Sequence, residues 1–90
     1  MSTVAVVIPC LDEAENLRIL LPRVHEVVSA FHLPATVWVV DGGSTDGTPA
    51  VAEELGARVL RQRGRGYGGA IRTAFEDIDA GFLITLDADY

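Results

Sequence analysis

The stretch Val37-Trp38-Val39-Val40-Asp41-Gly42-Gly43-Ser44-Thr45-Asp46-Gly47-Thr48-Pro49 decides the fold that we expect of this chain. Its first four residues are β-branched or aromatic without a polar break, which is typical of a strand buried on both faces. Asp41 then comes at the carboxyl end of the strand, where open α/β sheets bind their ligands. The two glycines that follow permit a turn and a close ligand approach. Thr48 and Pro49 predict a helix that begins with threonine as its N-cap and proline in its first turn.

Strands and helices are predicted to alternate on both sides of this stretch. Apolar runs over 3–8, 57–60 and 82–86 predict three more strands, the first ended by Pro9. Apolar residues at three- and four-residue steps between 17 and 31 predict an amphipathic helix, in which Pro22 predicts a kink or a division into two segments. Two further helices are expected over 49–55 and 70–79. This alternation predicts a Rossmann-like α/β fold: four parallel strands in the order 3-2-1-4, with three helices on the two faces.

The composition indicates a globular chain. Ninety residues make a single small domain, and 49% hydrophobic with 22% charged residues argues against disorder. A net charge of −6 argues against a general nucleic-acid or anionic-membrane binder. The lone Cys10 excludes an intramolecular disulfide and fits a reducing compartment. Without an apolar run that could span a bilayer or a signal-peptide pattern, we expect a cytoplasmic domain; a membrane association of the parent protein would come from segments outside residues 1–90.

Carboxylates follow three of the four predicted strands. They are Asp12 and Glu13, Asp41, and the pair Asp87 and Asp89. Because the carboxyl ends of parallel strands share one edge of the sheet, we expect these acids to converge although they are far apart in sequence. Carboxylates together with phosphate oxygens and water suit a hard cation such as Mg²⁺ or Mn²⁺. A cation held there would neutralise charge on a departing diphosphate.

Each motif also has a plainer interpretation when it is taken alone. Asp87-Ala88-Asp89 is also compatible with a solvated strand end, and the 41–48 stretch with a helix-capping turn. The glycine-rich stretch 64–69 lacks the P-loop lysine, and the first strand lacks a dinucleotide-binding fingerprint. The arginines that precede this stretch also fit a role as exposed edge charges that oppose aggregation. Glu13 and Asn16 also fit an ordinary helix-capping pair.

The motifs are more specific together, because they occur in the order and at the spacing of a known family. They are Pro9-x-x-Asp12-Glu13, Val40 to Thr48, the loop from Gly64 to Ala70, and Asp87-Ala88-Asp89. The chain resembles the N-terminal, nucleotide-sugar-binding half of an inverting family 2 glycosyltransferase with the GT-A fold. It is most similar to the branch that holds the dolichyl- or polyprenyl-phosphate sugar synthases. The resemblance covers essentially all of residues 1–90.

The resemblance implies a role for each matching position. The residues that it places along the nucleoside pocket are Pro9, Leu11, Glu13 and Val39. It implies that Asp41 hydrogen-bonds the base or the ribose, with uracil and guanine both open. Many relatives carry a second acid where this chain has Gly42, which puts only a secondary contact in doubt.

The same resemblance implies the diphosphate and metal contacts. Asp87 and Asp89 would be the metal-binding acids of the family's D-x-D motif, holding Mg²⁺ or Mn²⁺. Ala88 would pack beside the ribose and diphosphate. Arg65 stands where relatives often carry a lysine or arginine, which implies a contact with the diphosphate.

Two functions follow as hypotheses. The first is a glycosyltransferase that moves a sugar from a nucleoside diphosphate (UDP or GDP) to an acceptor such as polyprenyl phosphate, with inversion. The second is a truncated or engineered nucleotide-binding half-fold without catalysis. Relatives continue well past the D-x-D acids and supply the acceptor site and general base there, so we expect residues 1–90 alone to be inactive. A nucleotidyltransferase ranks low, because such enzymes open with a glycine- and basic-rich loop where this chain has Pro9 to Glu13.

The last predicted strand, 82–86, is apolar and uncharged, and it is expected at the edge of the sheet. Such an edge favours pairing with another chain. We therefore expect a homo-oligomer formed through this strand.

Overall fold

Strands and helices alternate along the whole chain, as predicted. The computed structural model of the protein describes residues 3–88. The elements are β1 (Val4–Cys10), α1 (Ala14–Val28), β2 (Ala35–Asp41), α2 (Thr48–Glu54), β3 (Arg58–Arg61), α3 (Gly66–Asp77) and β4 (Phe82–Thr85).

The four strands form one parallel sheet in the order β3-β2-β1-β4, which confirms the predicted order. In the longest pairing, Val4 of β1 lies opposite Ala35 of β2, and Cys10 lies opposite Asp41. Parallel strands all end at the same edge of the sheet. The loops that follow β1, β2 and β3 therefore lie together at the carboxyl edge.

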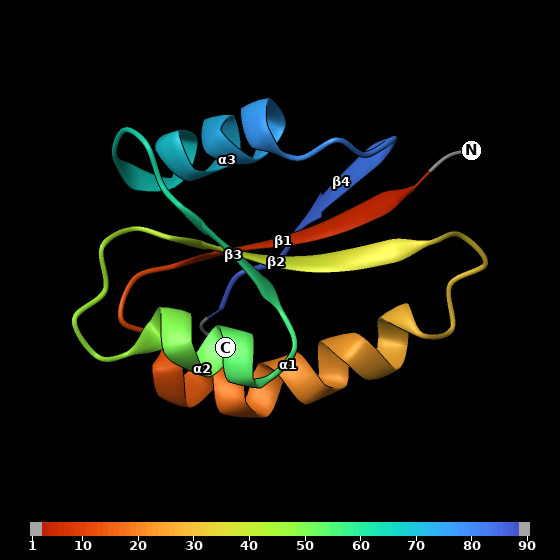
Figure 1. The fold of residues 1–90 in the computed structure, drawn as a ribbon, viewed down its shortest axis with the longest axis horizontal. Coiled ribbons are helices and arrows are strands. Elements are labelled where there is room, and N and C mark those ends of the chain that lie inside the picture. The colour runs from red at the N-terminus through yellow and green to blue at the C-terminus, as the bar shows by residue number, and fades with distance from the viewer. Residues whose placement is uncertain (1–2, 89–90) are drawn as a thin grey trace.

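Helices cover both faces of the sheet, with α1 and α2 on one face and α3 on the other (Figure 1). The two central strands are valine-rich because both of their faces are buried. Val6 and Val39 belong to the core cluster beneath α1 and α2, whereas Val7 and Val40 belong to the cluster beneath α3. Their alternation divides the apolar core into two layers.

Pro9 ends the pairing of β1 with β4 but does not end β1 itself, which corrects the predicted end of this strand. The strand continues through Pro9 to Cys10 and stays in register with β2. On the other side, the amide of Leu86 donates to the carbonyl of Val7 at 3.0 Å. In a parallel ladder the carbonyl of Leu86 would next accept from the N–H of residue 9, and proline has none. The β1–β4 pairing therefore stops here, and Asp87 and Ala88 lie outside the sheet.

The helices differ from the sequence prediction at three points. Helix α1 is one continuous helix, and Pro22 does not divide it. Pro22 is exposed, so the backbone carbonyl that loses its partner can bond to water. Gly47, with φ +85°, occupies the N-cap position of α2 that was predicted for Thr48, while Pro49 lies in the first turn as predicted.

Helix α3 begins at Gly66, four residues before the predicted start at Ala70. The prediction placed 66–69 in a loop because glycine disfavours helices. Close packing explains the glycine at position 69: a Cβ there would lie 2.9 Å from the carbonyl carbon of Gly64. The helix and the turn before it can approach only without that side chain.

Strand β4 lies at one edge of the sheet and pairs with β1. The side chains of Phe82 and Ile84 are 56% and 41% exposed although both are apolar. They share the α1 face of the sheet, because Ile84 lies opposite Val6 in the ladder. Helix α1 covers β1 and β2 and leaves these side chains uncovered. Within residues 3–88, no helix has the length and apolar character that a membrane span needs.

Candidate functional site

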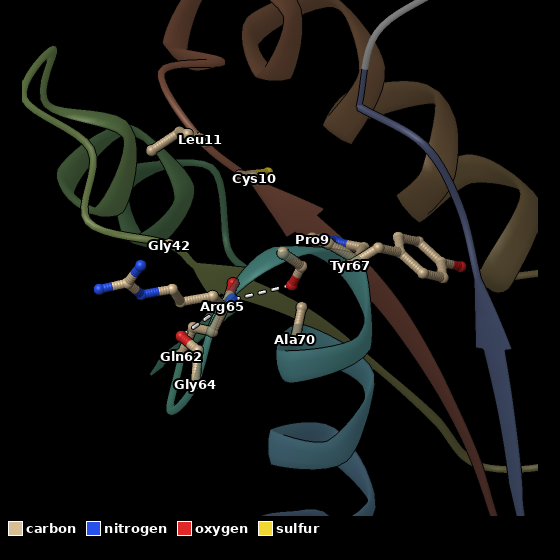
Figure 2. A pocket seen from close by; sticks show the side chains of 10 residues that line it. Pro9, Cys10, Leu11, Gly42, Gln62, Gly64, Arg65, Tyr67 and Ala70 are labelled. Carbon is tan, nitrogen blue, oxygen red and sulfur yellow. Dashed lines mark hydrogen bonds between the residues drawn. The ribbon is translucent and has the colours of Figure 1, made fainter.

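A cleft of about 350 Å³ opens at the carboxyl edge of the sheet (Figure 2). The end of β1 forms one wall, and the turn between β3 and α3 together with the first turns of α3 forms the other. The lining residues are Pro9, Cys10, Leu11, Gly42, Gln62, Gly64, Arg65, Gly66, Tyr67 and Ala70. This position is where open α/β sheets bind their ligands.

Hydrogen bonds fasten the β1–α1 loop to the β2–α2 loop. The backbone amide of Asp12 donates to Oγ of Ser44 at 2.8 Å, and Oδ1 of Asp12 accepts from the amide of Thr45, also at 2.8 Å. Asp12 adopts a φ of +54°, which a residue other than glycine rarely does. These long-range hydrogen bonds hold Asp12 in this conformation, and they thereby fix the backbone of the neighbouring Leu11 in the cleft wall.

The start of α1 is capped by residues from the β2–α2 loop. The amide of Glu13 donates to Oγ1 of Thr48 at 3.0 Å, and the amide of Ala14 donates to Oδ2 of Asp46 at 3.2 Å. The hydroxyl of Thr48 in turn donates to Oδ1 of Asp46. That hydroxyl, and less strongly the amides of Ala14 and Thr48, hold the pKa of Asp46 below its usual value. Thr48 is fully buried and joins two loops instead of capping its own helix.

Asp41 forms the turn that follows β2. Its carboxylate accepts hydrogen bonds from the amides of Gly43 and Ser44, both at 3.0 Å, and from the hydroxyl of Ser44 at 2.5 Å. Its side chain is 7% exposed. The carboxylate therefore shapes the loop, and most of its acceptor capacity is already used by the protein.

Arg65 lies on a tight turn at the N-cap position of α3. The glycines on either side have φ values of +78° (Gly64) and +67° (Gly66), a region that favours glycine. Arg65 and Tyr67 extend from this turn in different directions, with Tyr67 toward β4 (Figure 2). There the hydroxyl of Tyr67 donates to Oγ1 of Thr85 at 3.2 Å. The guanidinium of Arg65 and the N-terminal amides of α3 give this end of the cleft a positive character.

Arg63 stabilises the same turn from outside the cleft. Its guanidinium forms ion pairs with Asp77 at 2.7 Å and Glu76 at 2.8 Å, both near the end of α3. Arg63 is one of the arginines before residue 64 for which the sequence allowed a role as an exposed edge charge, and the structure gives it carboxylate partners. These partners raise its own pKa and lower the pKa of Asp77.

Cys10 lies at the inner side of the cleft as a neutral thiol. Burial raises its pKa to about 12, and the negative charges of Glu13, Asp41 and Asp46 add to the effect. Its Sγ donates weakly to the carbonyl of Ile8 at 3.5 Å. A thiol of this kind is a poor nucleophile at neutral pH.

The structure brings together three of the predicted binding residues and separates others from them. Pro9, Leu11 and Arg65 line the same cleft. Glu13 lines a neighbouring hollow with Asp12 and Asp46, and its Oε2 accepts from Nδ2 of Asn16 at 2.6 Å. This is the Glu13–Asn16 pair that the sequence left as an alternative.

Two apolar positions predicted to contact the nucleotide lie in the core. Val39 is 0% exposed and Ala88 is 3% exposed, and both belong to the cluster beneath α1 and α2. Asp87, between β4 and Ala88, is exposed at the carboxyl edge. Asp89 lies outside the described residues. In the described part of the predicted D-x-D motif, the carboxylate of Asp87 is therefore accessible to solvent, whereas Ala88 is packed in the core.

Within residues 3–88, acids of the β1–α1 and β2–α2 loops gather at the carboxyl edge, where Asp12, Glu13 and Asp46 line one hollow, but they do not form a metal site. No group of three His, Cys, Asp or Glu side chains there could hold a metal ion. The oxygens of Asp12, Asp41 and Asp46 are bonded to backbone amides and hydroxyls of the two loops. Protein donors therefore compensate these charges.

The D-x-D residues nevertheless have the chemistry that a divalent cation requires. Asp87 offers exposed carboxylate oxygens, which are hard ligands. Mg²⁺ and Mn²⁺ use one or two carboxylates and take their other ligands from phosphate oxygens and water. Such a site does not need a cluster of three or more protein carboxylates, so the residue types at positions 87 and 89 fit such a cation.

Gln62 and Tyr67 are cleft residues that the sequence reasoning missed. Gln62 follows β3 directly, and Tyr67 stands among the glycines that were assigned to a loop. The position of Gln62 at a strand's carboxyl end was the available signal for a site residue. Nothing in the local pattern marked Tyr67.

The parallel sheet and its carboxyl-edge cleft place the chain in the class of open α/β domains, which bind their ligands at that edge. The family follows from the sequence: residues 5–90 match the family described as Glycosyl transferase family 2, and the chain belongs to it. This confirms the resemblance found from the motifs.

Curated relatives support the assignment. The chain is 42% identical to the glycosyltransferase AglJ of Haloferax volcanii over 89 residues, which cover 96% of this chain and 27% of AglJ. It is 37% identical to the undecaprenyl-phosphate 4-deoxy-4-formamido-L-arabinose transferase of Serratia proteamaculans, covering 96% of this chain and 28% of that protein. The chain thus spans about a quarter of the length of these two relatives.

Solved structures confirm the GT-A-type sheet. Mannosyl-3-phosphoglycerate synthase from Rubrobacter xylanophilus matches with a TM-score of 0.87 and 27% identity, over 98% of this chain and 31% of that one. Glucosyl-3-phosphoglycerate synthase from Mycobacterium tuberculosis, solved with Mn²⁺, UDP and glucosyl-3-phosphoglycerate, matches with a TM-score of 0.81 and 27% identity, over 98% of this chain and 34% of that one.

Proposed function

We propose that residues 1–90 form the donor-binding domain of an inverting glycosyltransferase that uses a nucleoside-diphosphate sugar. One observation carries the proposal: in a family 2 chain, a cleft at the carboxyl edge of the sheet combines the apolar wall of Pro9 and Leu11 with the cationic turn of Arg65. The apolar wall suits a nucleoside and the cationic turn suits a diphosphate. UDP in the mycobacterial synthase supports this class of donor.

Roles for individual residues follow from this assignment. Arg65 neutralises the diphosphate, and Asp41 holds the loop that faces the base and ribose and retains capacity for one further hydrogen bond. Asp87 and Asp89 hold Mg²⁺ or Mn²⁺, while Ala88 anchors the segment between them. A divalent cation in this place stabilises negative charge on the departing nucleoside diphosphate. Mn²⁺ in the mycobacterial complex supports the use of such a cation.

We further propose a polyprenyl phosphate as the acceptor of the parent enzyme and a cytoplasmic position for this domain. The undecaprenyl-phosphate transferase among the relatives supports a lipid-linked acceptor. The free Cys10 fits the reducing compartment that a cytoplasmic position implies.

For residues 1–90 alone, we propose donor binding without sugar transfer. General-base catalysis needs a group that can take a proton from the acceptor hydroxyl or phosphate. The cleft-lining residues within 3–88 include no carboxylate and no histidine, and the Cys10 thiol is neutral. A radiolabelled-sugar transfer assay on the ninety-residue chain should give no turnover, and sugar transfer at an enzymatic rate would contradict this proposal.

Calorimetric titration with UDP and with GDP tests the donor site. At least one of them should bind more tightly with Mn²⁺ or Mg²⁺ than without, and Asp87→Asn and Asp89→Asn should each remove that dependence. Asp79→Asn is a matched control, since Asp79 is also exposed but follows α3 at the opposite edge of the sheet. Metal-independent binding that the D-x-D variants leave unchanged would reject the metal role, and absence of binding would reject the donor site.

A further inference from the structure

The amide of Gln62 has a fixed orientation in the cleft. Its Nε2 donates to the carbonyl of Gly66 at 2.9 Å and, at 3.4 Å, to that of Gly64. Carbonyl oxygens only accept hydrogen bonds, so the NH₂ group must be the end that faces them. Figure 2 shows Gln62 beside this turn, below Arg65.

The other end of the amide lies toward Gly42 across the cleft. A Cβ added to Gly42 would meet Oε1 of Gln62 at 3.2 Å, which is closer than an ordinary contact. The missing side chain at position 42 therefore leaves room for the amide oxygen. Both residues line the cleft, and Gln62 is half-buried, so its oxygen faces a partly enclosed space.

This oxygen is an acceptor that the described protein leaves unused. The hydrogen bonds of Gln62 among residues 3–88 all involve its Nε2 or its backbone. The other side chains that line the cleft carry no amide or carboxylate oxygen. The nearby carboxylate of Asp41 is buried and accepts three hydrogen bonds from its own turn. Among the side chains that line the cleft, Gln62 therefore offers an amide oxygen to the donor group of a ligand, in addition to the one position that Asp41 retains behind the lining.

We propose that Gln62 determines base specificity: its Oε1 accepts a hydrogen bond from the ring N–H of the nucleotide base. This inference rests on the proposed nucleotide site. Uracil and guanine both carry such an N–H, whereas the corresponding ring nitrogens of cytosine and adenine are acceptors and would be repelled. Because the two glycine carbonyls clamp the amide, it cannot turn to offer its NH₂ group to those bases instead.

The four nucleoside diphosphates and inorganic pyrophosphate test the proposal by calorimetric titration. UDP and CDP are a matched pyrimidine pair, GDP and ADP a purine pair, and pyrophosphate is a probe without a base. In the unsubstituted protein, UDP should bind more tightly than CDP, or GDP more tightly than ADP, by about tenfold for one hydrogen bond. Gln62→Met, similar in length but without an acceptor, should bring that ratio close to one while the pyrophosphate affinity stays within about twofold.

Gly42→Ala is the second variant, because it crowds Oε1 but leaves the donors of Gln62 intact. It should also lower the ratio, and adding it to Gln62→Met should have no further effect, since the two changes act on the same contact.

The outcomes separate this inference from the proposed function. If UDP or GDP binds and its preference is unchanged in Gln62→Met, the base-reading role is wrong while the nucleotide site stands. An equal loss for every ligand, pyrophosphate included, would make Gln62 only a clamp for the Arg65 turn and would also overturn the inference. If the unsubstituted protein binds no nucleotide, the proposed function fails and this inference fails with it.

Discussion

At the scale of single residues, the site depends on acids whose charge the protein itself compensates. Asp41 and Asp12 each accept hydrogen bonds from amides of the β2–α2 loop. Hydrogen bonds to a charged group are stronger than neutral ones, and removing the charged partner leaves several donors without an acceptor. These acids therefore fix the loops around the cleft, whether or not a cation is bound nearby.

Asp41→Ala should destabilise the fold. The substitution removes the acceptor of the Gly43 and Ser44 amides and of the Ser44 hydroxyl. We expect the free energy of unfolding to fall by about 1–3 kcal/mol. Asp41→Asn keeps one acceptor oxygen and should lose less. Urea unfolding followed by Trp38 fluorescence measures both variants.

Asp79→Asn serves as the control here as well, because Asp79 is exposed and should change stability by less than about 0.5 kcal/mol. An Asp41→Ala protein as stable as the unsubstituted one would show that the carboxylate does not hold the turn.

At the scale of elements, Pro9 ends the β1–β4 ladder just before Asp87 and Ala88. In Pro9→Ala, the new N–H at position 9 can donate to the carbonyl of Leu86 and extend the β1–β4 ladder by one bond. One such bond is worth about 0.5–1.5 kcal/mol, so hydrogen exchange at position 9 should be slow, as in a sheet. The segment from Asp87 would then be drawn toward β1, and metal-dependent nucleotide binding should weaken.

Pro34→Ala is the matched control, since Pro34 lies before β2 and away from the cleft. It should leave nucleotide binding unchanged. If the amide at position 9 of Pro9→Ala exchanges its hydrogen as rapidly as in a solvated loop, contacts other than the proline end the β1–β4 ladder.

The elements also show how far the sequence determines the fold. Apolar runs such as Val4 to Ile8 and Val37 to Val40 predict the strands, because strands buried on both faces have no polar break. The alternation of helices and strands then predicts that the strands run parallel. The start of α3 could not be predicted from Gly66, Gly68 and Gly69, since propensity opposes a helix there and only tertiary packing against Gly64 favours it.

The cleft was predictable only in part. Pro9, Leu11 and Arg65 belong to motifs, and they line it. The side chain of Gln62 is held in the cleft by its hydrogen bond to Gly66 and lies against Gly42. Gly42 is 20 residues away in the sequence, and nothing in the local pattern marks Gly66 as a partner. Thr48 carries a capping signature, but its hydroxyl donates to the nearby Asp46 and accepts from the amide of Glu13, which comes close to it only in the folded chain.

At the scale of the whole molecule, apolar surface is left uncovered on one side. A groove of about 310 Å³ runs between α1 and β4, lined by apolar side chains that include Val27, Phe31, Ile84 and Leu86. Next to it, β4 is an edge strand of the sheet that residues 3–88 form, and it carries no charged residue. Natural sheets usually protect such an edge with charge, proline or a covering segment. The uncovered apolar face and the open edge of the sheet therefore lie next to each other.

We propose that a second copy of the chain covers this surface by antiparallel pairing of β4 with β4. A two-fold axis perpendicular to the sheet keeps both α1 helices on the same face, so the two apolar grooves become neighbours. A stable interface needs about 1,200–2,000 Å² in total. A strand of four residues provides less, so Val27 of α1 and Phe31, which follows α1, must join the contact.

Light scattering at concentrations well above micromolar tests the assembly, and it should give the mass of a dimer. Ile84→Lys places a charge on the pairing strand and should give a monomer. Ile19→Lys, an equally drastic change at an exposed position of α1 outside the groove, should leave the dimer intact. A monomeric mass for the unsubstituted chain would exclude the second copy as the occupant. Equal dissociation by both lysine variants would place the interface elsewhere, because β4 contributes nothing specific in that case.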